Sequence, residues 1–410
     1  MECQNSPPII MTTIASTRGG RRWIGALIII SSSPFFHQAV NGFLISSHRS
    51  VSSRTMTIAR AKNNSHEVDD ASSLCHLSRR SAIAIIGATA ALAPLSIPLY
   101  PVNAIDNGSI PNLPLLRTDV EFPMLALNTA GMSTEDTCQA IEFAREEGMT
   151  HIDFHPGQER DGVANYLSKH DKDERELLFL TTKIRKAPPG TSPKDAANLA
   201  RDQIDEDLRI LNVKNVDMLM LRDSPDPKVI QSQWAVMEMA LAEGKTRSIG
   251  VVNYCPSALK SVLQTAKVFP AVNYIMVHVG MGEDVHGLRA AGENVAGIRT
   301  FAYGQTGEPT PNMEIVNNPI LQKIGKAHGK STLEVALRWV IQNGMAASIR
   351  PSASFGRCLG EECRLGIAKQ ASCFDWALSE REMAKLDAME SPDDNPTLFS
   401  SAGCTEAFGM

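Results

Sequence analysis

The chain has 410 residues, of which 43% are hydrophobic and 21% charged, a composition typical of a folded protein and not of a disordered one. Its 40 Lys and Arg residues against 45 Asp and Glu residues give a net charge of −5. Residues 105–410 are more acidic than the whole, because residues 1–104 hold nine basic and only four acidic side chains. So acidic a domain is not expected to bind nucleic acid.

Residues 1–60 have the composition of a targeting signal. Glu2 is their only acidic residue, serines, threonines and arginines are plentiful, and a short apolar run over residues 23–30 follows Arg21 and Arg22. This run is too short to cross a bilayer about 30 Å thick as a helix. The segment therefore resembles a signal peptide or a transit peptide.

A second targeting unit follows over residues 78–104. An arginine pair precedes a mostly apolar stretch at residues 82–100, and a small residue, Ala104, ends the unit. This order is typical of a twin-arginine export signal. The alternative is that the apolar stretch remains as an anchor, but Pro94 and Pro98 argue against a stable membrane helix.

Two export signals in series resemble the nested presequences of proteins sent to the thylakoid lumen in algae whose plastid lies inside extra membranes. A bacterial exported protein is a weaker alternative, because it would not need residues 1–60. We therefore predict a targeting presequence over residues 1–104 and a destination in the plastid, in the thylakoid lumen. The mature domain, residues 105–410, is expected to have no membrane span.

Six of the eight cysteines follow the predicted presequence. They form no Cys-x-x-Cys pair and their spacing does not match a structural zinc site, so we predict no bound metal. Cys358 and Cys363 lie close together in the sequence and could form a small-loop disulfide in an oxidising compartment. The alternative is six separate thiols.

From residue 123 onward, short apolar runs alternate with longer amphipathic segments. The runs predict eight strands, at residues 124–128, 150–154, 178–183, 216–221, 247–252, 272–275, 298–303 and 346–350. The segments between them carry apolar residues at every third or fourth position, which predicts helices that include residues 134–147, 194–211, 229–242 and 332–342.

This alternation of strand and helix indicates parallel pairing, because a parallel neighbour needs a long crossover. Eight units over about 250 residues predict an α/β fold of the (β/α)8 TIM-barrel class. No Gly-x-Gly-x-x-Gly follows the first strand, which argues against an open doubly wound sheet.

Chemistry in such a barrel gathers where the strands end. The residues at the predicted carboxyl ends are Asp153, Lys183, Arg222, Asn253, Tyr274 and Tyr303. An Asp, a Lys and an Arg at one mouth would strongly perturb one another's pKa values. They form either an active site or a structural ion network at the barrel rim.

Several motifs resemble those of aldo-keto reductases. Residues 234–254 are similar to the family's W-x-x-M-E helix and the E-G-K-x-R-x-I-G-V-S-N-F/Y strand that follows it. Further matches are residues 151–153 to H/R-I-D-T-A, 181–183 to T-T-K, 336–344 to A-L-R-W-x-I-Q-x-G, and 374–379 to F-D-F/W-x-L-S. The resemblance runs in order, and at fitting spacing, from Pro123 to Leu386.

The resemblance implies NADP(H) as the cofactor and the reduction of aldehydes and ketones as the reaction. In that family a hydride leaves the nicotinamide, while a tetrad of Asp, Tyr, Lys and His supplies the proton and orients the carbonyl. A tyrosine with a pKa of about 10 is too weak an acid alone, and a neighbouring Lys paired to an Asp lowers its pKa.

Half of this tetrad carries over. The family's Asp falls on Asp153 and its Lys on Lys183. Five positions after the Asp, where the family has Tyr, this chain has Gln158, or Gly157 if one residue is deleted, and Arg222 replaces the family's His. We assign Asp153, Lys183, Arg222 and Gln158 to the catalytic site, although neither the Gln nor the Arg is a useful acid.

The cofactor side is also altered. Asn253 matches the family's Asn for the nicotinamide carboxamide, Tyr303 matches the aromatic residue on which the ring stacks, and Tyr274 replaces a Gln. Arg350 and Arg364 fall where the family binds the adenosine phosphate, without the usual Glu-Asn. We assign these five residues to cofactor binding; the two arginines either clamp phosphates or are solvated loop side chains.

We therefore predict an aldo-keto reductase-like, NADP(H)-linked oxidoreductase with altered or weak activity. Lys183, with its pKa lowered by Arg222, or else His155, would supply the proton. The ligand would be a small-molecule carbonyl or an anion, and the domain is expected to be a monomer. The alternative is a non-catalytic lumenal barrel that acts as a binding or assembly protein.

Overall fold

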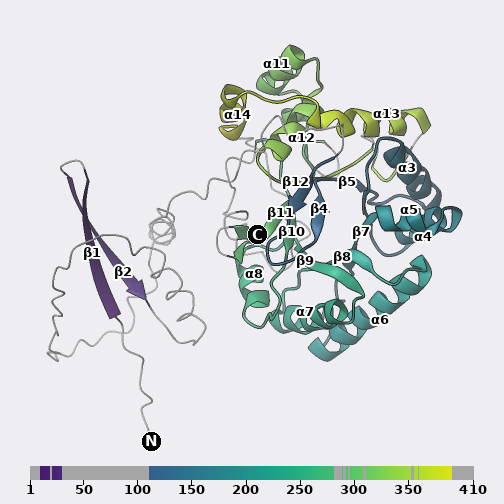
Figure 1. Cartoon of the computed structure of the whole chain (residues 1–410), viewed down its shortest axis with the longest axis horizontal. Coiled ribbons are helices and arrows are strands. Elements are labelled where there is room, and N and C mark those ends of the chain that lie inside the picture. Colours follow the sequence, from purple (N-terminus) through teal and green to yellow (C-terminus); the bar gives the residue numbers. More distant parts are fainter. Residues whose placement is uncertain are drawn as a thin grey trace, which may run out of the picture. The chain divides into compact units, whose positions relative to one another are not determined.

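The computed structural model describes residues 10–18, 21–29, 110–280, 289, 292–293, 296–307, 311–351, 355–358 and 360–389 (Figure 1). The chain divides into two units, Met1–Thr89 and Ala90–Met410. In the first unit, β1 (Ile10–Arg18) pairs antiparallel with β2 (Arg21–Ile29). The predicted twin-arginine unit, residues 78–104, lies outside the described residues, so the presequence stays a prediction.

The second unit is a closed barrel of eight parallel strands (Figure 1). The strands in order around the barrel are β5 (Leu125–Asn128), β6 (His151–Asp153), β7 (Phe179–Ile184), β8 (Val216–Arg222), β9 (Thr246–Val252), β10 (Val272–Met276), β11 (Arg299–Tyr303) and β12 (Ala346–Ile349). Each strand pairs with its neighbour in sequence, and β12 closes the ring on β5. The predicted (β/α)8 fold and its eight strands are confirmed.

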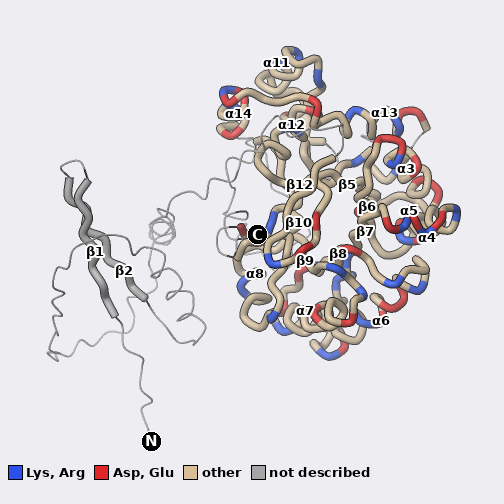
Figure 2. Tube along the Cα trace, in the orientation of Figure 1, with Lys and Arg blue, Asp and Glu red and all other residues tan. Residues whose placement is uncertain are grey.

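Helices surround the barrel (Figure 1). They are α3 (Thr134–Glu146), α4 (Gln158–Lys169), α5 (Lys172–Leu177), α6 (Pro193–Leu211), α7 (Pro227–Ala242), α8 (Pro256–Leu263), α10 (Met313–Val316), α11 (Pro319–His328), α12 (Thr332–Gln342), α13 (Gly360–Ala371) and α14 (Glu380–Asp387). Acidic and basic residues are interspersed along α4, α6 and α7 (Figure 2). None of the helices that the structure describes is long and apolar enough to cross a bilayer.

Local sequence explains where these elements begin. Strand β7 is buried along its whole length, as expected for a strand covered on both faces. Helix α12 begins with a capping box, in which the Ser331 hydroxyl accepts from the backbone of Glu334 and the Glu334 carboxylate accepts from the backbone of Ser331. Helices α6 and α7 begin at Pro193 and Pro227, where a proline costs no helical hydrogen bond.

A disulfide joins Cys358 to Cys363, from the segment after β12 to the first turn of α13. Of the two possibilities left open by the sequence, the structure therefore has the small-loop disulfide and not separate thiols at these positions. Cys138 and Cys373 are buried free thiols.

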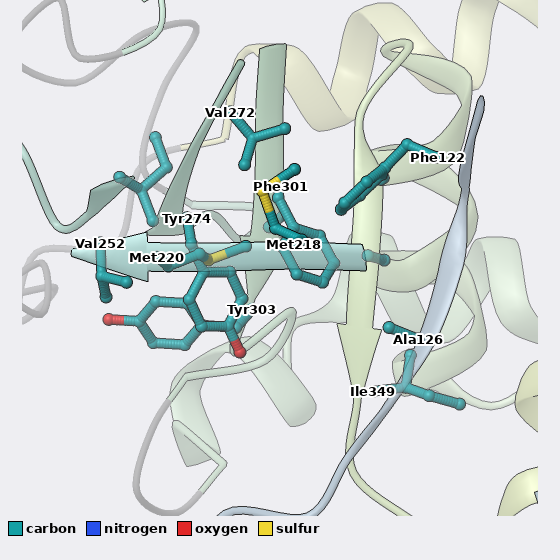
Figure 3. Packing of buried hydrophobic residues seen from close by; sticks show 14 of the residues in the cluster. Phe122, Ala126, Met218, Met220, Val252, Val272, Tyr274, Phe301, Tyr303 and Ile349 are labelled. Atoms are coloured by element: carbon teal, nitrogen blue, oxygen red, sulfur yellow. The ribbon is translucent and has the colours of Figure 1, made fainter. Parts of the chain in front are cut away.

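The sequence analysis missed a small hairpin that precedes the barrel. Strand β3 (Asn112–Pro114) pairs antiparallel with β4 (Glu121–Pro123). The ring of Phe122 is fully buried and makes edge contacts with Phe179, Phe301 and His151, at centroid distances of 5.2, 5.0 and 4.7 Å. Figure 3 shows Phe122 and Phe301 in this apolar cluster. The hairpin thus adds an aromatic side chain to the core of the barrel.

We expect Phe122→Ala to lower the free energy of unfolding by about 3–5 kcal/mol, because it removes a buried ring and leaves a cavity. Urea denaturation followed by circular dichroism measures the change. Leu177→Ala is the control: this side chain is 57% exposed, so its truncation should change the free energy by no more than about 0.5 kcal/mol. Equal effects of the two variants would contradict the role assigned to the hairpin.

His151, at the start of β6, is fully buried and neutral. Its Nδ1 donates to the carbonyl of Pro123 at 3.1 Å and its Nε2 accepts from the Thr181 hydroxyl at 2.7 Å. Burial lowers the pKa of His151 from 6.5 to about 4. Between these two values the unfolded chain binds a proton at His151 that the folded protein does not bind. The free energy of unfolding therefore decreases as the pH falls from 6.5 towards 4.

We expect the folded protein to lose about 2 kcal/mol of stability through His151 between neutral pH and about pH 5. Urea denaturation across this range, compared with the same series for His151→Gln, isolates the contribution. The variant should be less stable at neutral pH and should lack this part of the pH dependence. Parallel curves for the two proteins would show that His151 does not titrate as described.

Candidate active site

A buried ion pair lies at the carboxyl ends of the barrel strands. The carboxylate of Asp153, the last residue of β6, accepts a hydrogen bond from the ammonium of Lys183 on β7, and both side chains are fully buried. The hydroxyl of Ser348 on β12 donates to the second carboxylate oxygen of Asp153 at 2.7 Å. The structure therefore brings together two of the four residues assigned to catalysis and adds Ser348, which sequence reasoning had missed.

The pKa values of the pair follow from burial and mutual charge. Burial lowers the pKa of Lys183, although the Asp153 carboxylate opposes this. Burial raises the pKa of Asp153, but the charge of Lys183 and the hydrogen bonds from Lys183 and Ser348 outweigh it, so the pKa of Asp153 lies below its ordinary value. Arg222 lowers the pKa of Lys183 in the direction that the sequence predicts, but less than burial does.

No tyrosine hydroxyl within the described residues receives a hydrogen bond from Lys183. The ammonium donates to Asp153 and to the carbonyl of Phe154, at 3.4 Å in the latter case. The ring of Tyr274 lies beside it, with 5.1 Å between the ring centroid and Nζ. The Tyr274 hydroxyl accepts instead from the amide of Asn128, at 3.2 Å.

Neither of the two positions that align with the family's tyrosine brings a side chain to the ion pair. Gln158 is exposed at the start of α4, and its backbone carbonyl accepts from the Thr134 hydroxyl at 3.3 Å. Gly157 caps the helix with φ 110° and ψ −137°, a conformation that residues with a side chain rarely adopt. A tyrosine would be strained at Gly157, and the structure does not place Gln158 in the buried cluster.

Arg222 ends β8 and is half-buried, and its carbonyl accepts from the Tyr254 hydroxyl at 3.3 Å. Its charge acts on the pKa values of both Lys183 and His155, which places it in the same electrostatic cluster. The next residue, Asp223, pairs with Lys186 at 3.1 Å. Arg222 is therefore positioned to attract an anionic group to the mouth of the barrel.

A second pair of titratable side chains follows β6. The Nδ1 of His155 lies 2.9 Å from a carboxylate oxygen of Glu159, in the first turn of α4. Glu159 was missed by the sequence analysis, although a Glu four positions after a His at a helix start indicates such a pair. Burial raises the pKa of Glu159, but hydrogen bonds from His155 and Gly131 lower it below its ordinary value.

The structure brings three of the predicted cofactor residues together on neighbouring strands. Asn253 follows β9 with φ 59°, a left-handed conformation that Asn tolerates better than most residues. Its side-chain carbonyl accepts from the Tyr303 hydroxyl at 2.8 Å. The rings of Tyr274 and Tyr303 are 4.7 Å apart and tilted by 48°, and Figure 3 shows them side by side. An aromatic face and an amide therefore meet at the mouth.

The two predicted phosphate-binding arginines have different surroundings. The guanidinium of Arg350 lies 4.4 Å from the centroid of the Phe355 ring, on the segment that leaves β12. Arg364 is exposed on α13 and pairs with Glu361 at 3.0 Å. Arg357, near the disulfide, pairs with Asp136 on α3 at 3.2 Å. The assignment of Arg350 and Arg364 to phosphate binding stays a prediction.

Within the part of the chain that the structure describes, no group of three or more His, Cys, Asp or Glu side chains could hold a metal ion. The groups gathered at this end of the barrel are an ion pair, a His–Glu pair, an arginine and two tyrosines. These groups can attract an anion, hold an aromatic ring and move a proton.

The closed parallel barrel places the chain in the (β/α)8-barrel class of proteins, with a buried Asp–Lys pair at its strand ends. Comparison with known proteins then shows the family. A family model described as Aldo/keto reductase family matches residues 124–389. The chain belongs to this family.

Relatives of known activity are similar over nearly their whole length. A morphine 6-dehydrogenase of Pseudomonas putida is 28% identical over 289 residues, which cover 67% of this chain and 90% of the relative. A glyoxal reductase of Bacillus subtilis is 25% identical, covering 68% and 92%. Among solved structures, a Bombyx mori aldo-keto reductase in complex with NADP has a TM-score of 0.53 at 24% identity, covering 67% and 92%.

We expect Lys183→Met to lower the free energy of unfolding by about 3–5 kcal/mol, because it leaves the Asp153 carboxylate buried without its partner. The double variant Asp153→Asn with Lys183→Met buries no charge at this position and should be more stable than Lys183→Met alone. Urea denaturation of the variants measures this difference. Arg364→Ala, which breaks an exposed ion pair, is the control and should not move the transition. A double variant less stable than Lys183→Met would contradict the coupling.

Proposed function

We propose that the chain is an NADP(H)-linked oxidoreductase of the aldo-keto reductase type, with weak turnover of ordinary carbonyl compounds. The observation that carries this proposal is the Asp153–Lys183 pair, kept at the barrel mouth without a tyrosine hydroxyl among its described hydrogen-bond partners. General acid catalysis is typically worth about 10² to 10⁴ in rate, so a proton donor placed differently from the family's tyrosine slows the reaction by part of this factor without removing the site.

The residues at the mouth fit a nicotinamide cofactor. Asn253, just after β9, offers amide groups, and Tyr303, at the end of β11, offers an aromatic ring that is 8% exposed. Both lie at the same end of the barrel as the ion pair. The bound cofactor would supply the hydride. That a Bombyx mori family member is in complex with NADP supports the same choice of cofactor here.

The substrate class follows from the site and from relatives. Morphine 6-dehydrogenase and glyoxal reductase are names of enzymes that act on small molecules, which supports a small-molecule carbonyl as the substrate. Arg222 at the mouth favours a carbonyl compound that also carries a negative charge. We retain a monomer as the expected state of the domain.

We expect NADPH to stabilise the protein against heat, by about 2.7 kcal/mol at a concentration of roughly 100 times Kd. A thermal-shift titration with NADPH and NADP⁺ measures this. Asn253→Gly is the matched variant, since glycine tolerates the positive φ at this position while the amide is lost. We expect it to weaken binding roughly tenfold or more. No shift at millimolar NADPH would contradict cofactor binding and favour a non-catalytic binding or assembly protein.

We also propose the plastid, and within it the thylakoid lumen, as the destination, on the evidence of the two signal-like units in residues 1–104. A fluorescent protein fused to residues 1–104 should reach the lumen. Replacing Arg79 and Arg80 by lysines should hold it outside the lumen, because a twin-arginine signal depends on that pair. A fusion that stays in the cytosol would contradict the proposal.

A further inference from the structure

The His155–Glu159 pair is a rigid unit beside the ion pair. The Glu159 carboxylate accepts four hydrogen bonds. Two come from the backbone N–H groups of Gly131 and His155, both at 2.8 Å, one from the Thr129 hydroxyl at 3.1 Å, and one from the His155 ring at 2.9 Å. Glu159 is therefore fixed from both the β5–α3 turn and the β6–α4 turn. A carboxylate held in this way fixes the orientation of the imidazole that it binds.

The other charged groups of the cluster cannot deliver a proton to a ligand. Lys183 and Asp153 are fully buried, and Asp153 is ionised. The Glu159 carboxylate is ionised as well, since its pKa is lowered. An arginine side chain is not a useful acid, because it keeps its proton in proteins. The side chain of His155 is 22% exposed and lies within the electrostatic reach of Lys183 and Arg222. Among the charged and titratable groups of this cluster, His155 is therefore the candidate that can both titrate and reach a ligand.

We propose that His155 donates the proton in carbonyl reduction, in place of the family's tyrosine, and that Glu159 is its positioning residue. This inference rests on the proposed function. The N–H bond at Nε2 of the imidazolium breaks and an O–H bond forms on the carbonyl oxygen, while the hydride comes from the reduced nicotinamide, which is thereby oxidised. His155 is left neutral and takes a new proton from water.

The hydrogen bonding determines which nitrogen acts. Glu159 accepts from Nδ1–H, so this proton is held and Nε2 is the nitrogen that exchanges. The two turns that carry the pair both follow barrel strands, β5 and β6, at the end where Asp153 and Lys183 lie. His155 thus reaches the mouth from the same loop that carries the tyrosine in the family, two residues after Asp153 and not five.

A histidine donor gives a pH dependence that a tyrosine donor does not. Burial and the charges of Lys183 and Arg222 lower the pKa of His155, Glu159 raises it, and the net pKa lies below 6.5. Asp153 also faces His155, and the charge of the His155 ring lowers the pKa of the Asp153 carboxyl. Reduction should therefore be fastest at acidic pH and fall as the pH rises through the pKa of His155. A tyrosine, with a pKa of about 10 before any shift, would stay protonated in this range.

The first test compares His155→Gln with the matched control His170→Gln, whose ring lies on Tyr166 and outside the cluster. Single-turnover reduction of 4-nitrobenzaldehyde by the NADPH-loaded enzyme is followed across acidic and neutral pH. We expect His155→Gln to lose about 10² to 10⁴ in rate and the acidic pH dependence, and His170→Gln to lose neither. Added imidazole should restore part of the rate to His155→Ala.

NADPH binding to the same variants, measured by thermal shift, separates the two proposals. A wild-type protein that binds no NADPH contradicts the proposed function itself. Normal binding with an unchanged pH profile in His155→Gln overturns only the proton donor. The proposed proton donor would also be overturned if Tyr274→Phe lost the pH dependence while His155→Gln retained it. That result would make Tyr274 the acid.

The second test needs no turnover. Nuclear magnetic resonance of the ligand-free protein follows the ring proton of His155 as the pH changes, with His155→Gln used to assign the signal. We expect a pKa below 6.5 that falls further in Glu159→Gln, because the carboxylate favours the imidazolium. The pH profile of single-turnover reduction should move by the same amount. A His155 pKa unaffected by Glu159→Gln would overturn the positioning role.

Discussion

The buried Asp153–Lys183 pair is the constraint on which the site depends. Two charges with no exposed surface are tolerated in a protein interior only when they are paired and their remaining hydrogen-bonding atoms are satisfied. The Ser348 hydroxyl donates a hydrogen bond to the second carboxylate oxygen of Asp153. Ser348 lies on β12, the strand that closes the barrel by pairing with β5. The ion pair therefore ties the chemistry at the mouth to the closure of the barrel, and it can persist as structure after a catalytic partner is lost.

The turn after β6 holds the two positions that align with the family's tyrosine. Gly157 caps α4 with a backbone conformation that disfavours any side chain, and Gln158 is exposed. The same turn places His155 and Glu159 against each other, so a new titrating pair lies where the chain departs from its family. Arg222 adds positive charge to this mouth, and the balance of charge differs from that of a site built around a neutral histidine and a tyrosine.

The sequence predicted the barrel well because each strand is a continuous apolar run and each long helix carries a clear period. It did not predict the β3–β4 hairpin, whose strands have three residues each and whose largest buried side chain, Phe122, packs on aromatic residues from distant strands. In the site, Asp153, Lys183, Asn253 and Tyr303 could be found because they end strands within recognisable motifs. Ser348 could not, since its hydrogen bond to Asp153 spans 195 positions of sequence. Glu159 was overlooked although its position four residues after His155 indicates the pair.

In the proposed reaction the proton reaches the substrate from His155 and not from a tyrosine or from Lys183. A crystal structure with NADP⁺ and a carbonyl-containing inhibitor tests it most directly, because a proton donor must lie about 2.6–3.2 Å from the oxygen that it protonates. We expect Nε2 of His155 at that distance from the inhibitor's carbonyl oxygen, with Nδ1–H still donating to Glu159. A tyrosine hydroxyl or the Lys183 ammonium in that position would contradict it.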